Sequence, residues 1–235
     1  MLGRPVVFRI KICGITRGED ALHAARAGAD ALGLNFYALS KRGITREQAA
    51  RVANDLRTKF DRPPKLVGVF VNESADSIVE AQRVVGLDAV QLHGDEPPEQ
   101  IVDLPEGVPV IRAARIGEAG LKPVVDYLES CQRLGREVAA VLVDAAELKA
   151  DRPEYGGSGR QVDWARVAAE KQLLGSTPLL LAGGLKAENV AEAIRMVGPM
   201  GVDTASGVES APGVKDPGMV NGFVSQAREA FSGGS

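Results

Sequence analysis

One stretch near the N-terminus decides the fold: Phe8-Arg9-Ile10-Lys11-Ile12-Cys13-Gly14. It is a short, largely apolar strand candidate that ends in a thiol and a glycine. The next segment, Gly18–Ala27, is rich in alanine and stops at Gly28, which predicts a helix closed by a glycine cap. Apolar residues return at Ala31–Leu34. The three segments therefore predict one strand–helix–strand unit with parallel strands.

The same alternation continues to the end of the chain, and its strands are short continuous apolar runs, as in a parallel sheet covered by helices. The expected strands are Phe8–Ile12, Ala31–Leu34, Lys65–Val71, Ala89–Leu92, Val108–Ala113, Ala139–Val143, Leu179–Ala182 and Gly201–Thr204. The expected helices are Gly18–Ala27, Thr45–Lys59 with a capping box of Thr45 and Gln48, one capped by Asn72 or Ser74, one beginning at Pro97-Pro98, Leu121–Leu134, Asp163–Leu174, Ala187–Val197 and Pro217–Phe231. Eight units without a linker predict a single α/β domain over residues 1–235, a (β/α)8 TIM barrel with a frayed tail at Gly233–Ser235.

Composition excludes several classes of protein. The chain has 235 residues, of which 45% are hydrophobic and 25% charged, and its net charge is −3. This balance gives no electrostatic footprint for nucleic acid, and neither a signal peptide nor a membrane span is expected. The cysteines, Cys13 and Cys131, form no disulfide framework and, with His23 and His93, no zinc-ligand pattern. We expect a cytoplasmic enzyme without metal or cofactor, in which Cys13 is a free thiol.

Two titratable groups stand at the ends of buried strands. Cys13 ends the first strand, and Asp144 follows the apolar run Val138–Val143. The C-terminal ends of the strands carry the active site in barrels of this kind, so a thiol and a carboxyl group facing each other there would suit a base and an acid. Cys13 also fits an inert buried thiol, and Asp144 a cap for the next segment. An unused carboxyl group at the end of an apolar strand is, however, costly.

Glycine-bearing loops follow the last two expected strands. Gly183 and Gly184 follow the seventh, and Asp203, Ser206 and Gly207 lie in or after the eighth. Backbone N–H groups of such loops approach anions closely, and this pair of loops is the usual phosphate site of the fold. Either loop alone would be read as a tight turn.

Three further segments bear on the site. Arg42, after the second strand, suits a planar carboxylate, although an arginine taken at random is more often solvated. His93, after the fourth strand, is a candidate acid or base, or a group that orients a neighbour. The loop Tyr155–Gly159, after the polar stretch 145–154, is either a lid over the substrate or a disordered surface loop. His23 and Cys131, both within helices, are expected to be structural.

Five segments together resemble the phosphoribosylanthranilate isomerase family of tryptophan biosynthesis. They occur in the order found in that family and cover almost the whole chain. They are Lys11–Thr16, Gly68–Asn72, Gln91–Glu96, Leu181–Leu185 with Glu188–Val190, and Asp203–Glu209 with Lys215–Asp216.

The resemblance implies an Amadori rearrangement without cofactor or metal. N-(5-phosphoribosyl)anthranilate, an aminoaldose, becomes the aminoketose 1-(2-carboxyphenylamino)-1-deoxyribulose 5-phosphate. By the family's pattern Asp144 is the general acid that protonates the furanose ring oxygen, and Cys13 the general base that removes the proton from C2 of the sugar. Arg42 would hold the anthranilate carboxylate, the loops after strands seven and eight the phosphate, and Asp203 would contact the sugar region.

Other interpretations remain open at this point. A sugar-phosphate epimerase or the related histidine-pathway isomerase would have the same fold, although the latter uses two aspartates where this chain has Cys13. A barrel that binds a phosphorylated ligand without turning it over needs neither Cys13 nor Asp144. The expected partner is a small phosphorylated substrate, without nucleic acid or membrane, and both a monomer and a homodimer are compatible with the sequence.

Overall fold

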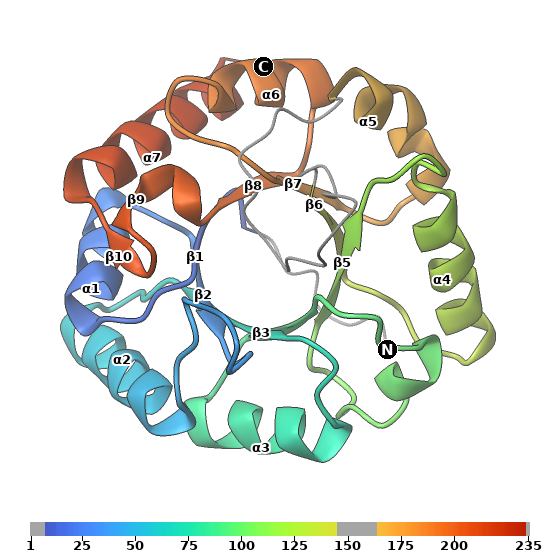
Figure 1. Cartoon of the computed structure of the whole chain (residues 1–235), viewed down its shortest axis with the longest axis horizontal. Helices are drawn as coiled ribbons and strands as arrows, with labels where there is room; N and C mark the ends of the chain where they lie inside the picture. The colour runs from blue at the N-terminus through green and yellow to red at the C-terminus, as the bar shows by residue number, and fades with distance from the viewer. Residues whose placement is uncertain (1–7, 145–163, 234–235) are drawn as a thin grey trace.

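The computed structural model describes residues 8–144 and 164–233, and in these ranges eight parallel strands close into a barrel in chain order (Figure 1). The strands are β1 Ile10–Cys13, β2 Ala31–Asn35, β3 Lys65–Phe70, β4 Ala89–Leu92, β5 Val110–Arg115, β6 Ala140–Asp144, β7 Leu179–Ala182 and β8 Gly201–Thr204. Strand β1 pairs with both β2 and β8, which completes the ring. The predicted (β/α)8 barrel is confirmed.

Helices surround the barrel on its outside, as Figure 1 shows. They are α1 Gly18–Ala27, α2 Arg46–Lys59, α3 Ala75–Val85, α4 Lys122–Arg133, α5 Trp164–Glu170, α6 Val190–Val197 and α7 Pro217–Ser232. Short 3-10 turns occupy η1 Pro98–Ile101, η2 Lys171–Leu174 and η3 Ser206–Val208. A small antiparallel hairpin, β9 Glu209–Ala211 and β10 Val214–Lys215, follows β8 and was not predicted.

Capping residues set the N-terminal ends of several helices. Thr45 accepts a hydrogen bond from the backbone N–H of Gln48, whose side chain accepts one from Thr45, so the predicted capping box is confirmed. Of the two caps considered for α3, Ser74 is the one used. The fourth expected helix begins at Pro97-Pro98 as predicted, but it is only the single 3-10 turn η1. Pro105 and Gly107, which has a φ of +88°, follow too closely for a longer helix.

Apolar side chains pack in two clusters separated by the wall of the barrel. Alternate strand residues point outward and pack against the helices, as Ile10 and Ile12 do. Inside lies a smaller set, here called the inner apolar cluster, which helices do not enter. Its buried members are Phe8, Ala31, Val67, Ala89, Ile111, Ala113, Ala140, Leu142, Leu180 and Ala182. The barrel is thus a packed core, and only its C-terminal end is left for a site.

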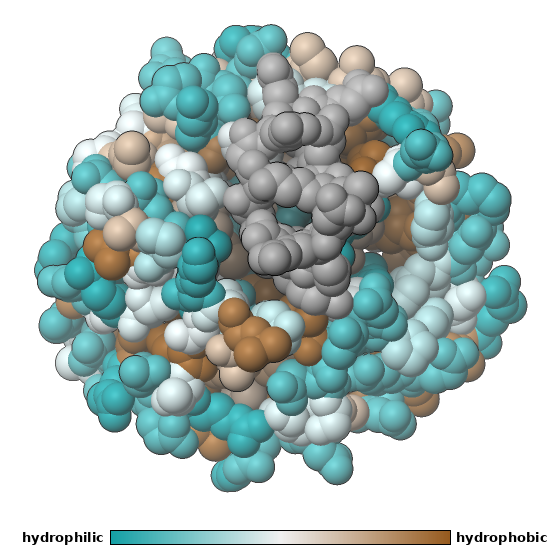
Figure 2. Space-filling model, viewed as in Figure 1, coloured by the Kyte–Doolittle hydropathy of each residue, from teal (hydrophilic) through white to brown (hydrophobic). Residues whose placement is uncertain are grey.

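The surface of the described residues is mostly polar in the view down the barrel, with scattered apolar side chains (Figure 2). No helix in the described ranges is long and apolar enough to cross a membrane. The candidate lid Tyr155–Gly159, the stretch 145–154 before it and the last two residues of the predicted frayed tail lie outside the described residues. The division into one domain stays a prediction.

Candidate active site

A cavity opens at the C-terminal ends of the strands and encloses about 750 Å³, part of it open to solvent. Eight of the nine predicted site residues line it, although they come from loops and strands far apart in the chain. These are Cys13, Arg42, His93, Asp144, Gly183, Gly184, Asp203 and Ser206. The fold therefore brings both candidate catalytic groups to one hollow. Among the described residues no group of three or more His, Cys, Asp or Glu side chains is placed to hold a metal ion.

Cys13 is packed tightly on one side and open to the cavity on the other. A Cβ atom on Gly33 of β2 would come within 2.6 Å of Cys13 Sγ, so a residue without a side chain is required beside the thiol. Burial raises the pKa of the Cys13 thiol and Asp203 adds to this effect, whereas Lys11 and Lys215 oppose it. The thiol form therefore predominates in the free protein at neutral pH.

Lys11 lies beside Cys13 on the inward face of β1 and is fully buried. Its Nζ donates to Asp203 Oδ1 at 2.9 Å and to Gln91 Oε1 at 3.0 Å. Burial alone would lower the pKa of Lys11, but Asp203 and Cys13 outweigh that effect and raise it. Lys11 is thus an ammonium ion beneath the cavity, next to the candidate base.

Gln91 connects this lysine to the other end of the site. Because Lys11 is only a donor, Gln91 Oε1 faces it, and Gln91 Nε2 faces His93 Nδ1 at 3.2 Å. This arrangement makes His93 Nδ1 the acceptor, which assigns the proton of a neutral imidazole to Nε2. His93 Nε2 lies 3.6 Å from Asp144 Oδ2. His93 is therefore placed to orient the carboxyl group or to donate to a ligand.

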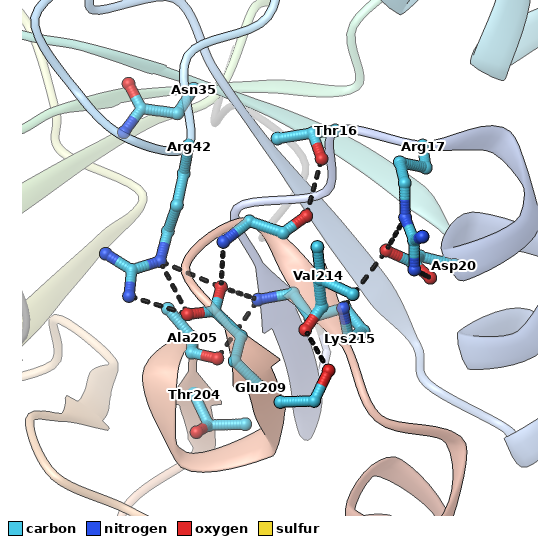
Figure 3. Close-up of polar contacts among 12 residues, drawn as sticks. Thr16, Arg17, Asp20, Asn35, Arg42, Thr204, Ala205, Glu209, Val214 and Lys215 are labelled. Atoms are coloured by element: carbon cyan, nitrogen blue, oxygen red, sulfur yellow. Dashed lines mark hydrogen bonds and ion pairs between the residues drawn. The ribbon is translucent and has the colours of Figure 1, made fainter.

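Arg42 reaches the cavity rim already bound to a carboxylate. Its Nε and Nη2 form a two-pronged ion pair with Glu209, and the shortest contact is 2.7 Å (Figure 3). Lys215 Nζ donates to the same carboxylate at 2.8 Å. Burial alone would raise the pKa of Glu209, but Arg42 and Lys215 hold it below its usual range. Glu209 thus fixes one edge of the Arg42 guanidinium.

The β2–α2 loop that carries Arg42 is held by its own side chains. Ser40 Oγ accepts from Asn35 Nδ2 and from the backbone N–H of Arg42, both at 3.1 Å. Asn35 Oδ1 in turn accepts from the backbone N–H of Tyr37 at 2.9 Å. Asn35, Tyr37 and Ser40 also line the cavity. The loop therefore presents Arg42 in a defined position.

The two glycine loops lie against each other as expected. Gly183 and Gly184 have φ values of +92° and +62°, a left-handed conformation in which a side chain would be strained. Thr204 Oγ1 donates to the carbonyl of Leu185 at 2.6 Å and ties the second loop to the first. Gly207 does not line the cavity: it packs so closely on the Leu185 carbonyl that a Cβ atom would overlap it.

Sequence reasoning missed four buried polar residues that support the site: Lys11, Gln91, Glu209 and Lys215. Two of them carried a detectable signal. Lys11 is two residues before Cys13, so strand alternation places both side chains inside the barrel, and Gln91 precedes His93 by the same spacing. The other two, Glu209 and Lys215, lie in the β9–β10 hairpin, where Glu209 binds both Lys215 and Arg42.

Comparisons with known proteins show the family of this chain. Residues 10–226 match the sequence model of a family described as N-(5'phosphoribosyl)anthranilate (PRA) isomerase. A curated relative of that name from Myxococcus xanthus is 49% identical over 223 residues, covering 94% of this chain and 96% of the relative. Another, from Geobacter sulfurreducens, is 44% identical and covers 94% of this chain and 99% of the relative.

Solved structures of similar proteins belong to the same isomerase family. The phosphoribosyl anthranilate isomerase of Thermotoga maritima superposes with a TM-score of 0.80 at 38% identity, covering 94% of this chain and 99% of that one. A further isomerase structure, described as a complex with reduced 1-(o-carboxyphenylamino)-1-deoxyribulose 5-phosphate, gives a TM-score of 0.77 at 35% identity, with the same coverage. A second Thermotoga maritima structure is described as that of monomers generated from a dimeric isomerase.

Proposed function

This chain belongs to the N-(5'-phosphoribosyl)anthranilate isomerase family, and on that premise we propose that Asp144 and Cys13 are the acid and base of its reaction. The reaction is the isomerisation of N-(5-phosphoribosyl)anthranilate to 1-(2-carboxyphenylamino)-1-deoxyribulose 5-phosphate in tryptophan biosynthesis. The observation that carries the assignment of roles is that Cys13 and Asp144 enter one cavity from β1 and β6.

The first step opens the ribose ring. Asp144 gives its proton to the furanose ring oxygen, the C1–O bond breaks, and the nitrogen lone pair forms the C1=N bond of a Schiff base. This role requires Asp144 to carry a proton when the substrate is bound. The His93 Nε2–H group, 3.6 Å from Asp144 Oδ2, would stabilise the carboxylate left behind.

The second step moves the double bond. Cys13 removes the proton from C2, and the electron pair of that C–H bond forms a C1=C2 double bond as the nitrogen becomes neutral. The resulting enolamine tautomerises to the ketone. A thiolate is needed, although burial favours the thiol, so only a minor thiolate population reacts. Lys11 and Lys215 limit this cost.

Two anionic groups of the substrate would hold it across the cavity. The anthranilate carboxylate fits Arg42, since Arg42 lines the cavity and Glu209 binds Nε and Nη2 of its guanidinium but not Nη1. The phosphate fits the loops after β7 and β8, where Gly183, Gly184 and Ser206 line the wall. Asp203 would contact the sugar between them. Anchoring both ends fixes C2 near the base.

The partner that we propose is thus a small phosphorylated substrate. A monomer and a homodimer are both compatible with this site, because every group named in the mechanism comes from one chain. A cytoplasmic location stays a prediction.

Anthranilate fluorescence tests the activity. Freshly made phosphoribosylanthranilate should lose its fluorescence rapidly with the wild-type protein and at the uncatalysed rate with Cys13→Ser. Loss at the wild-type rate with the variant would remove Cys13 from its role. No loss with the wild type would contradict the isomerase assignment itself.

A further inference from the structure

Among the described residues, Lys11 places an ammonium ion inside the barrel, and the mechanism gives it no contact with the substrate. Lys11 is fully buried and is not among the residues that line the cavity, so it cannot touch the substrate directly. A buried lysine is expensive unless it is paired. Its two fixed partners, Asp203 and Gln91, come from opposite sides of the ring, β8 and β4. Such a group requires an explanation beyond packing.

Its position relative to the thiol supplies one. Lys11 and Cys13 are two residues apart on β1, so both side chains point into the barrel, and the positive charge of Lys11 acts to lower the pKa of the thiol. Asp203 also faces Cys13, with the opposite charge. The thiol therefore lies beside an ion pair whose positive member would stabilise a thiolate and whose negative member would oppose it.

We propose that Lys11 is the positioning residue that makes Cys13 a usable base by stabilising its thiolate, and that Asp203 opposes this stabilisation. The inference rests on the proposed function only in that Cys13 is the base. When substrate approaches, the proton of the thiol must leave, and Lys11 offers the thiolate a donor that is already oriented by Asp203 and Gln91. Little rearrangement is then needed at the moment of proton transfer.

The charged groups around Cys13 agree with a stabilising effect of Lys11 on the thiolate. The ionisable groups that act on it are Lys11 of β1, Asp203 of β8, Lys215 of β10 and Arg42 of the β2–α2 loop. Lys215 and Arg42 share Glu209, which neutralises one of their two charges. Lys11 and Asp203 cancel each other in the resting state. His93 and Asp144 line the same cavity from the far side of the barrel, after β4 and on β6.

The test is the alkylation of Cys13 by iodoacetamide as a function of pH, followed by mass spectrometry of each cysteine peptide. Lys11→Met, which keeps the length of the side chain and removes its charge, should raise the apparent pKa by at least about one unit and slow alkylation at neutral pH about tenfold. Asp203→Asn should shift both quantities in the opposite direction. Lys122→Met, on the exposed surface of α4, is the matched control and should change neither.

The two variants are expected to shift the alkylation of Cys13 in opposite directions, which distinguishes an electrostatic effect from damage to the fold. Cys131, 1% exposed in the core, is an internal indicator, because its alkylation reports unfolding in the same sample. If Lys11→Met does not fold, Asp203→Asn still decides: faster alkylation of Cys13 supports the proposal, and slower or unchanged alkylation overturns it. Shifts of both variants in the same direction also overturn it.

Kinetics distinguish this proposal from the function on which it rests. Lys11→Met should lower kcat about tenfold and leave KM nearly unchanged, since Lys11 does not line the cavity, and Lys11→Arg should recover part of kcat. If Cys13→Ser is active and the Lys11 and Asp203 variants show the predicted alkylation shifts, Cys13 is not the base but Lys11 does act on the thiol. If Cys13→Ser is inactive and those variants show no shift, only the role of Lys11 is contradicted.

Discussion

The inside of the barrel contains two sets of residues with different roles: one fills the core and the other supports the site. The inner apolar cluster, with Ile111 and Leu180 among its fully buried members, fills the space as a packed core does. The polar set, Lys11, Gln91 and Asp203, is also buried but is joined by hydrogen bonds of 2.9 and 3.0 Å, and Gln91 and Asp203 line the cavity. The same two-residue alternation of the strands creates both. Buried residues therefore differ in function according to whether their partners are carbon atoms or charges.

The largest expected effect is on the groups that the polar set supports. Asp144→Asn should lower kcat about 100- to 10,000-fold, the usual contribution of a positioned acid, as should Cys13→Ser for the base. Affinity for the product should stay within about tenfold, because neither change removes an anionic anchor. Stopped-flow fluorescence for kcat and equilibrium titration with product would measure both. Near-normal turnover in one variant would assign its role to another group.

Truncation in the apolar cluster should have the reverse profile. Ile111→Ala removes a side chain that is fully buried inside the barrel, so the free energy of unfolding should fall by about 2–5 kcal/mol. The kcat of the folded fraction should remain within a few-fold of wild type. Urea unfolding and activity at low temperature would check this pair of values. A large loss of kcat with little loss of stability would break the distinction between the two sets.

The rim of the cavity should affect binding more than chemistry. Arg42→Ala removes a charged hydrogen-bond donor for the substrate carboxylate, worth about 1.5–3 kcal/mol, so KM should rise roughly 10- to 100-fold while kcat falls less. Glu209 keeps Lys215 as a partner in this variant. Steady-state kinetics at saturating and limiting substrate would show the split. An unchanged KM would contradict the carboxylate clamp.

The pH dependence sharpens the assignment of the two titrating groups. Burial raises the pKa of Cys13, so the thiolate population rises with pH through neutrality while the protonated fraction of the acid falls. The wild-type kcat/KM should then change little where the two effects offset each other, and it should fall above the thiol pKa. The residual activity of Asp144→Asn lacks the acid limb and should rise about tenfold per pH unit up to the thiol pKa. A flat profile in that variant would contradict the scheme.

The smallest effect is expected far from both sets. Thr45→Ala removes the capping box of α2 and should cost about 1 kcal/mol of stability without changing kcat or KM. Thermal unfolding and the fluorescence assay would measure these quantities, with Ser74→Ala at the cap of α3 as a comparable case. A change in kcat would mean that the helical shell is coupled to the site.

The sequence predicted the parts of this molecule that depend on local patterns. Strands such as Ala89–Leu92 and Leu179–Ala182 have the predicted bounds, because short apolar runs between polar turns leave few alternatives. The predicted helix over Gly18–Ala27 also has its expected bounds, with Gly28 in the left-handed conformation of a cap. The cavity residues were predictable because they end strands, and parallel strands end on one side of the barrel.

What the sequence did not predict depends on contacts between distant segments. The pairing of Arg42 with Glu209 spans 167 residues and needs the β9–β10 hairpin, whose strands of three and two residues carry almost no periodic signal. The contact of Lys11 with Gln91 and Asp203 needs the closed barrel to bring three strands together. The sequence of a strand does not predict whether a charged residue in it is paired or exposed.

The most direct test of the account follows the C2 proton itself. Substrate deuterated at C2 of the ribose should lose its label to solvent during turnover by the wild-type protein and show a primary isotope effect on the proton-transfer step. With Cys13→Ser, release of the label should slow at least about 100-fold, while Lys122→Met should match the wild type. Release at the wild-type rate from the Cys13→Ser protein would show that another group removes the proton and would contradict the account.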